Sequence, residues 1–165
     1  MQLSYEILMD KRENPRKCTI APLKDRADFH IRYFSHGRKI SAFTATTLLH
    51  VEGELIQKAK SDDTVQLAVI DCNWRKVPST LQRVALPLPK LVRIPEGFVT
   101  AYPRANKEGK DPEHGLATIE ALFLAAAFFG NWDESLLEKY YFKDLFLQKN
   151  SEMFREHGLG NYGSK

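Results

Sequence analysis

The pattern of apolar and polar positions predicts strands in the first half of the chain and helices in the second half. Residues 3–9 alternate like a strand, residues 30–34 and 40–46 also read as strands, and the continuous apolar run 66–70 predicts a central buried strand. Residues 48–59 carry apolar side chains at helical spacing, so we expect a helix there, although a glycine inside it weakens the prediction.

Helical patterns dominate beyond residue 75. A short helix is predicted over residues 79–86, with Ser79 as its cap, and the loop 102–115 is long enough to suggest a function. Residues 116–129 are apolar nearly all round, which predicts a central buried helix. Asp133 is predicted to cap a second helix that runs to about residue 148, with one apolar stripe made of Leu136, Leu137, Tyr140, Tyr141 and Leu145.

This order of elements predicts an α/β fold with a mostly parallel sheet and a helical C-terminal portion. The length of 165 residues and the hydrophobic content of 43% suit one compact domain, with lobes that share a core. We expect an N-terminal α/β subdomain at residues 1–92, a C-terminal subdomain of loop and helices at 93–157, and a flexible tail at 158–165.

Composition narrows the class of protein. The two cysteines, and the lack of a basic head followed by a long apolar stretch at the N-terminus, favour a reduced, cytoplasmic setting. The longest apolar run, residues 119–129, is shorter than the roughly 20 residues that span a bilayer, so no membrane partner is expected. The five histidines show no metal-ligand spacing and no paired CxxC occurs, so we expect no metal site.

Charge is distributed unevenly although the net charge is only +3. Residues 11–39 hold nine Lys or Arg against three acids, whereas residues 111–156 hold four against nine. This segregation predicts a basic face suited to nucleic acid. Ordinary surface charge that folding intermixes explains the same counts and remains an alternative.

Residues 70–74, which read Ile-Asp-Cys-Asn-Trp, are the strongest candidate for a binding site. They close the predicted central strand, and ligands of open α/β folds collect at the carboxyl ends of strands. Asp71 would supply charge and Trp74 a flat apolar wall, so this segment could hold a cationic cofactor. On the residues alone, the commoner roles are a turn or cap for Asp71 and core packing for Trp74.

Four segments resemble a known family, in the same order, across roughly residues 3–150. They are residues 14–19 (Asn-Pro-Arg-Lys-Cys-Thr), residues 70–74, the stretch from Arg93-Ile94-Pro95 to Ala101-Tyr102-Pro103, and residues 116–121 (Leu-Ala-Thr-Ile-Glu-Ala). Together they resemble the aminocarboxypropyltransferases that modify small-subunit ribosomal RNA, whose superfamily includes DTW-domain tRNA-modifying proteins. Ile20 departs from the glycine usual in the family, and residues 102–106 replace its Asn-Pro-Val-Asn-Tyr-Gly segment.

The resemblance implies a SPOUT-like fold with a deep trefoil knot and S-adenosylmethionine as cofactor. It implies transfer of the 3-amino-3-carboxypropyl group to a uridine-type base of ribosomal RNA, in ribosome biogenesis. Asp71 is then the catalytic candidate, either as a base or, as we prefer, as an orienting charge. The cofactor-binding residues implied are Thr19, Ile40, Ile70, Asp71, Trp74, Val77, Ile94, His114, Leu116, Thr118 and Ala121.

RNA is the expected partner, and the protein is expected to act as a monomer. The candidate phosphate contacts are Lys11, Arg12, Arg16, Lys17, Lys24, Arg75, Lys76 and Arg104, with Tyr102 as a candidate for base stacking. Three alternatives stay open. One is a non-catalytic RNA-binding or ribosome-assembly module of the same fold, and the others are a tRNA aminocarboxypropyltransferase and a SPOUT methyltransferase.

Overall fold

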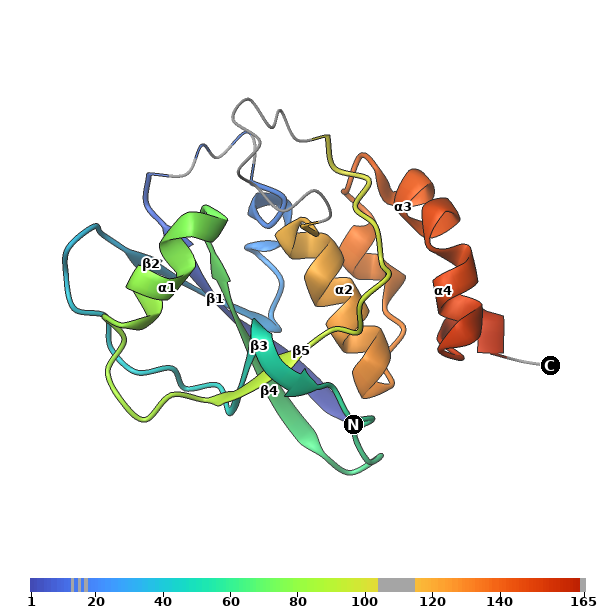
Figure 1. The fold of residues 1–165 in the computed structure, drawn as a ribbon, viewed down its shortest axis with the longest axis horizontal. Helices are drawn as coiled ribbons and strands as arrows, with labels where there is room; N and C mark the ends of the chain where they lie inside the picture. The colour runs from blue at the N-terminus through green and yellow to red at the C-terminus, as the bar shows by residue number, and fades with distance from the viewer. Residues whose placement is uncertain (13, 15, 17, 104–114, 164–165) are drawn as a thin grey trace. The chain divides into compact units, whose positions relative to one another are not determined.

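The computed structural model describes residues 1–12, 14, 16, 18–103 and 115–163. The chain divides into two compact units (Figure 1). Unit 1 comprises Met1–Leu55 and Ala59–Arg93, and unit 2 comprises Ile56–Lys58 and Ile94–Lys165. Each unit is described by itself below.

Unit 1 is built on a five-stranded sheet in which every pair of neighbouring strands runs parallel. This confirms the predicted α/β class and the mostly parallel sheet. The spatial order is β2-β1-β4-β3-β5, so the apolar strand β4 lies in the middle, as predicted. The bounds are Gln2–Asp10 for β1, Phe29–Phe34 for β2, Thr47–Leu55 for β3, Thr64–Asp71 for β4 and Lys90–Arg93 for β5.

One predicted strand and one predicted helix of unit 1 were wrong. Within the predicted strand 40–46, only Ile40 pairs, through an isolated parallel bridge with Val84. The predicted helix 48–59 is instead strand β3, because pairing with β4 and β5 outweighs the helical spacing of its apolar residues. Val51 and Leu55, which that spacing assigned to a buried face, are 63% and 44% exposed.

Gly53 explains why β3 tolerates a glycine. The register between β3 and β5 shifts between Leu49 and Glu54, which is the signature of a bulge or irregularity. A Cβ atom built on Gly53 would come within 2.4 Å of the backbone nitrogen of Val92. Only a residue without a side chain allows this close approach of two strands.

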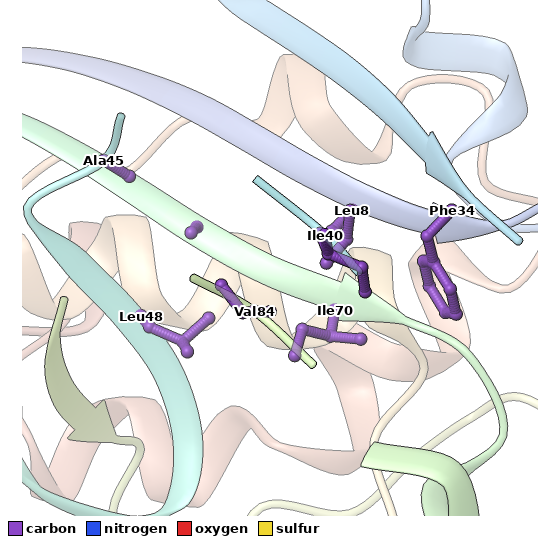
Figure 2. Packing of buried hydrophobic residues seen from close by; sticks show 8 residues of the cluster. Leu8, Phe34, Ile40, Ala45, Leu48, Ile70 and Val84 are labelled. Carbon is purple, nitrogen blue, oxygen red and sulfur yellow. The ribbon is translucent and has the colours of Figure 1, made fainter. Parts of the chain in front are cut away.

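The core of unit 1 gathers side chains from the sheet and from the segments around it (Figure 2). Figure 2 shows Ile40, Ile70 and Val84 close together. The cluster consists of Leu8, Phe34, Ile40, Ala45, Leu48, Ala68, Ile70 and Val84, with Cys72 and Val77 among the partly buried residues packed against it. Its apolar packing therefore extends to the residues that follow β4.

Three short helical segments complete unit 1. The 3-10 helix η1, Ala21–Leu23, follows β1, and the 3-10 helix η2, Trp74–Lys76, leads directly into helix α1, Val77–Leu81. Helix α1 thus begins before the predicted start at Ser79, and it ends well before Leu86. The Ser79 hydroxyl donates to the Lys76 carbonyl at 3.0 Å and does not cap the helix.

Unit 2 is helical in its described part. Helix α2, Thr118–Phe129, confirms the predicted apolar helix, and nine of its residues are buried. It ends at Gly130, whose φ of 105° is the left-handed conformation that commonly closes a helix. The remaining elements are the 3-10 helix η3, Glu134–Leu137, helices α3, Lys143–Lys149, and α4, Ser151–Glu156, and the 3-10 helix η4, Gly160–Gly163.

The single helix predicted for residues 133–148 was wrong. Asp133 does cap a helical segment, since its side chain accepts a hydrogen bond from the amide of Ser135, but that segment is the short η3. The chain then turns around Tyr140 before α3 begins. Tyr141, predicted within the apolar stripe, is 92% exposed.

Aromatic rings fill the interior of unit 2. Phe154 is fully buried, and Phe123, Trp132, Phe146 and Tyr162 all lie within 6.4 Å of its ring centre. Tyr162 belongs to the segment predicted as a tail, so the described part of that segment packs on the unit. Its mobility stays a prediction.

Candidate functional site

The carboxyl ends of β1 and β4 lie next to each other, because the two strands pair in parallel with Met9 opposite Asp71. Polar residues follow both strands at this edge of unit 1. Asp10 ends β1 and Asp71 ends β4, so two acidic residues stand on neighbouring strands. This is the edge at which parallel α/β sheets bind ligands.

The side chain of Asp10 is buried and held by two cations. Its carboxylate accepts hydrogen bonds from the guanidinium of Arg12 at 3.2 Å and from the ammonium of Lys76 at 3.1 Å. Burial alone would raise the pKa of Asp10, but the hydrogen bonds from Arg12 and the hydrogen bond and charge of Lys76 outweigh it and lower the pKa to about 2. Asp10 is therefore ionised and ties η2 to the end of β1.

Asp71 contacts the loop that follows β1. The thiol of Cys18 donates to its Oδ2 atom at 3.4 Å, across 53 positions of sequence. Burial raises the pKa of Cys18, the negative charge of Asp71 raises it further, and the result is about 11. Two of the segments that carry the family resemblance, residues 14–19 and 70–74, thus meet in unit 1.

Trp74 is the first residue of η2 and is half-buried. The preceding Asn73 caps this turn, because its side-chain oxygen accepts from the amide of Arg75 at 3.1 Å. The indole is therefore carried on a short capped helix that Lys76 anchors to Asp10.

The other predicted cofactor residues of unit 1 are largely apolar. Ile40 and Ile70 are buried members of the core cluster, and Val77 packs against it. Thr19 is half-buried, next to Cys18. Unit 1 thus brings together a carboxylate, an indole and an aliphatic cluster within and around the end of β4.

Unit 2 carries the rest of the predicted cofactor residues. Thr118 is the first residue of α2, and Ala117 precedes it as the N-cap. Leu116, Ala121 and Ile94 are half-buried, and His114 lies outside the described residues. That these residues form one pocket with those of unit 1 stays a prediction.

Glu120 organises the start of α2. This fully buried carboxylate accepts from the amides of Ala101 and Ala117, each at 2.8 Å. It also accepts from the hydroxyls of Thr100 at 2.7 Å and of Tyr140 at 2.8 Å. Since alanine has no side-chain acceptor, only the Glu120 half of a capping box forms here. Three separate segments of unit 2 are joined at one carboxylate.

Most of the predicted phosphate contacts that the structure describes follow the carboxyl ends of β1 and β4. Lys11 and Arg16 are exposed near the end of β1, and Arg75 is exposed in η2. Arg12 and Lys76 also reach this edge, but each forms an ion pair with Asp10, which compensates part of their positive charge. Lys24 is the exposed C-cap residue of η1, whereas Lys17 and Arg104 lie outside the described residues.

Tyr102, the candidate for base stacking, lies in unit 2. Its ring meets that of Phe142 edge to face, with centroids 6.0 Å apart, and the side chain is half-buried. Packing against Phe142 already uses part of this ring.

Sequence reasoning missed the acids that hold the structure around these residues. Asp10 and Glu120 were not singled out, and neither was Glu6, whose carboxylate accepts from the amides of Thr44 and Ala45, each at 2.8 Å. The available signal was an acidic residue inside an otherwise apolar element, since a buried charge requires partners. The contact between Cys18 and Asp71 had no such signal.

A separate hollow of about 230 Å³ lies in unit 1, lined in part by Ser4, Phe29, His30 and Gln66. Of the predicted site residues that the structure describes, none lines it. Within the ranges that the structure describes, no helix is long and apolar enough to cross a membrane. The same ranges contain no group of three or more His, Cys, Asp or Glu placed to bind a metal ion.

The fold is similar to that of a solved structure, the SAM-dependent rRNA:acp-transferase Tsr3 from Vulcanisaeta distributa. The TM-score is 0.65 at 19% sequence identity, and the match covers 93% of this chain and 82% of that chain. No protein-family model matches the sequence, and no curated protein matches it. At this identity, the likeness establishes a shared fold.

Proposed function

We propose that this protein transfers the 3-amino-3-carboxypropyl group of S-adenosylmethionine to a uridine-type base of small-subunit ribosomal RNA. The observation that carries the proposal is the hydrogen bond between Cys18 and Asp71, which joins two of the segments that resemble the aminocarboxypropyltransferases. The similar fold of Tsr3, over 93% of this chain, supports it independently of those segments. A cytoplasmic monomer acting in ribosome biogenesis is part of the proposal.

The residues at the end of β4 suit this cofactor chemically. A sulfonium cation is attracted by a carboxylate, and Asp71 supplies one. The face of Trp74 adds about 0.5 to 2 kcal/mol if it stacks on the cation. The aliphatic side chains of Ile40, Ile70 and Val77 suit the adenine, because small-molecule sites combine apolar walls with a few polar groups.

Residues of unit 2 complete the proposed binding set. The start of α2 favours an anion, because the helix dipole is positive there, so Thr118 is assigned to the carboxylate of the amino-acid arm. Thr19 of unit 1 is assigned to the same carboxylate. Ile94, Leu116 and Ala121 join the apolar wall, and His114 is assigned to the adenine edge.

Three carbons are bonded to the sulfonium sulfur, and we assign the choice of the reacting carbon to the orientation of the bound cofactor. When bound, the cofactor would supply an electrophilic carbon: attack by a ring nitrogen of the base would break the bond from that carbon to sulfur, release the neutral thioether methylthioadenosine and pass the ring proton to water. Trp74 and Val77 would bury the methyl group, and Asp71 would attract the cationic end, so that the amino-acid arm would face the RNA. We assign Asp71 an orienting role in preference to that of a general base.

A SPOUT-like class and a deep trefoil knot are part of the proposal and rest on the family resemblance. A crystal structure with continuous density from residue 93 to residue 150 tests this part of the proposal, since an unthreaded path for that segment would remove the knot.

A second candidate is an RNA-binding or assembly module that has lost turnover. Ile20 favours it, because this residue replaces a family glycine and is fully buried beside Cys18 and Thr19. Such a protein would bind RNA at the same edge without modifying it.

The deciding experiment uses S-adenosylmethionine labelled either in its carboxyl group or in its methyl group. The protein is incubated with small-subunit ribosomal RNA or with tRNA, and label in the RNA is counted. Carboxyl label in ribosomal RNA supports the proposal. Carboxyl label in tRNA alone would mean that tRNA is the substrate and ribosomal RNA is not. Methyl label would identify a methyltransferase, and RNA binding without label would favour the non-catalytic module. Asp71→Asn is the matched variant, expected to lose label transfer while remaining folded.

A further inference from the structure

Cys18 occupies a junction between two chain segments of unit 1. It lies in the loop after β1, half-buried, and its thiol donates to the Asp71 carboxylate at the end of β4. The backbone amides of Ile20 and Ala21, at the start of η1, are near enough to the same sulfur to lower the pKa of its thiol. The sulfur therefore lies between the start of η1 and Asp71.

The thiol remains protonated at neutral pH. Burial raises its pKa most, and the charge and hydrogen bond of Asp71 add to this effect, whereas the amides of Ile20 and Ala21 oppose it. With a pKa of about 11, Cys18 carries its hydrogen far above neutral pH. It can thus donate to the Asp71 carboxylate at neutral pH.

The thiol that contacts Asp71 differs in charge from the two side chains that hold Asp10. Asp10 is held by two cations, Arg12 and Lys76, and their charges compensate its own. Cys18 is neutral, so its hydrogen bond restrains Asp71 without adding positive charge beside it. A weak neutral donor suits a carboxylate that must attract a cationic ligand.

We propose that Cys18 is a positioning residue that fixes the orientation of the Asp71 carboxylate toward the cofactor through its S–H···O hydrogen bond. The role toward the cofactor rests on the proposed function. The hydrogen bond itself does not, and the two parts are tested separately.

The first test measures the thiol. In a Cys72→Ser background, Cys18 is the one remaining cysteine, and its rate of alkylation by iodoacetamide is measured against pH. The midpoint is expected near the pKa of about 11. Adding Asp71→Asn removes the charge and is expected to move the midpoint toward the ordinary thiol value of roughly 8.5. Equal pH midpoints of alkylation in the two proteins would overturn the interaction between Cys18 and Asp71.

The second test measures binding of S-adenosylmethionine by calorimetry. Relative to the Cys72→Ser parent, adding Cys18→Ala is expected to weaken binding about two- to tenfold, the usual effect of one hydrogen bond. Cys18→Ser, which keeps a donor, is expected to restore part of the loss. Equal affinities of the parent and the alanine variant overturn the positioning role.

The two failures are distinguishable. If the folded parent binds no S-adenosylmethionine, the proposed function fails, and the positioning role toward that cofactor fails with it. If the parent binds but the alkylation midpoint ignores Asp71→Asn, only the inference about Cys18 is lost. Circular dichroism of every variant separates both results from unfolding.

Discussion

Asp10 and Lys76 form an ion pair at 3.1 Å although 66 positions separate them in the sequence. The Asp10 side chain is fully buried, so its charge depends on this contact and on that with Arg12. The pair fixes η2, which carries Trp74, to the end of β1. A single acid thus stabilises the edge of the sheet on which the proposed site stands.

Asp10→Asn is expected to destabilise the protein at neutral pH. The pKa of Asp10 is lowered in the folded state, from 3.8 to about 2, so its contribution is present above 3.8 and is lost as pH falls toward 2. Arg12 and Lys76 are 51% and 39% exposed, and solvent weakens their effect. We therefore expect a loss of about 1 to 2 kcal/mol near neutral pH, measured by urea unfolding.

The pH dependence provides the control for Asp10. The difference between wild type and Asp10→Asn should shrink as pH falls toward about 2, because Asp10 then loses its charge in a growing fraction of the wild-type molecules. Asp28→Asn removes the partially exposed ion pair with Arg26 and should cost less, about 0 to 1 kcal/mol. A penalty for Asp10→Asn that stays constant with pH would contradict the electrostatic explanation.

Glu120→Gln is expected to be among the most damaging single changes in unit 2. The variant replaces a buried carboxylate that accepts four hydrogen bonds with an amide, whose NH₂ group would face N–H and O–H donors. A loss of about 3 to 5 kcal/mol is expected in thermal unfolding followed by circular dichroism. Tyr140→Phe removes one donor and should cost about 1 kcal/mol, so similar losses in both variants would argue against the cluster.

Gly53→Ala tests the close approach of β3 to β5. The added methyl group would overlap the backbone of Val92, which can move only with its strand, so we expect a loss of about 1 to 3 kcal/mol. Gly37→Ala is the matched control. It sits at a φ of 73° with nothing within 4 Å, so only conformational strain of about 1 kcal/mol applies. Urea unfolding that ranks Gly37→Ala as the worse variant would contradict the overlap.

Charge reversal at Lys11 and Arg16 is expected to weaken RNA binding and its dependence on salt. Both residues are exposed near the end of β1, and each lost phosphate contact lowers the slope of log affinity against log salt by about 0.7 to 0.9. Lys60→Glu is the control, because this exposed lysine precedes β4 and belongs to the opposite edge of the sheet. Equal effects of the two changes would indicate general charge attraction.

Trp74→Ala is expected to weaken S-adenosylmethionine binding more than RNA binding. The half-buried indole is assigned to the cation, worth about 0.5 to 2 kcal/mol, whereas phosphate contacts involve other side chains. Calorimetry with the cofactor and a salt titration with RNA measure the two affinities. Equal losses of both in a folded variant would remove Trp74 from the pocket.

The sequence predicted most accurately the elements whose side chains are mostly buried, because runs of apolar residues mark them. Strand β4 has a continuous buried apolar stretch and helix α2 is apolar on most sides, and both were located within two residues. The segment that forms β3 was mistaken for a helix because its helical spacing is accidental, and Val51, which suggested it, faces solvent. Pairing with two other strands determined its structure, and a local pattern contains no information about such partners.

The candidate site divides in the same way. The sequence located Asp71 and Trp74 after a buried strand, because that position depends on local order alone. It did not reveal that Cys18 would contact Asp71 or that Lys76 would be paired with Asp10, since both contacts arise from the placement of β1 beside β4. An ionic partner of this kind reduces the positive charge that a lysine can offer to a ligand. Composition counts every lysine alike, so it does not reveal this difference.

The spatial order of the strands constrains how the sheet of unit 1 can assemble during synthesis. β4 lies between β1 and β3, yet it follows both in the chain. When the ribosome has released the chain as far as residue 63, β1 and β2 can already associate, but β3 has no neighbour, because β4 and β5 are still missing. A nascent chain paused there would display an unmatched strand edge, the kind of surface that chaperones shield.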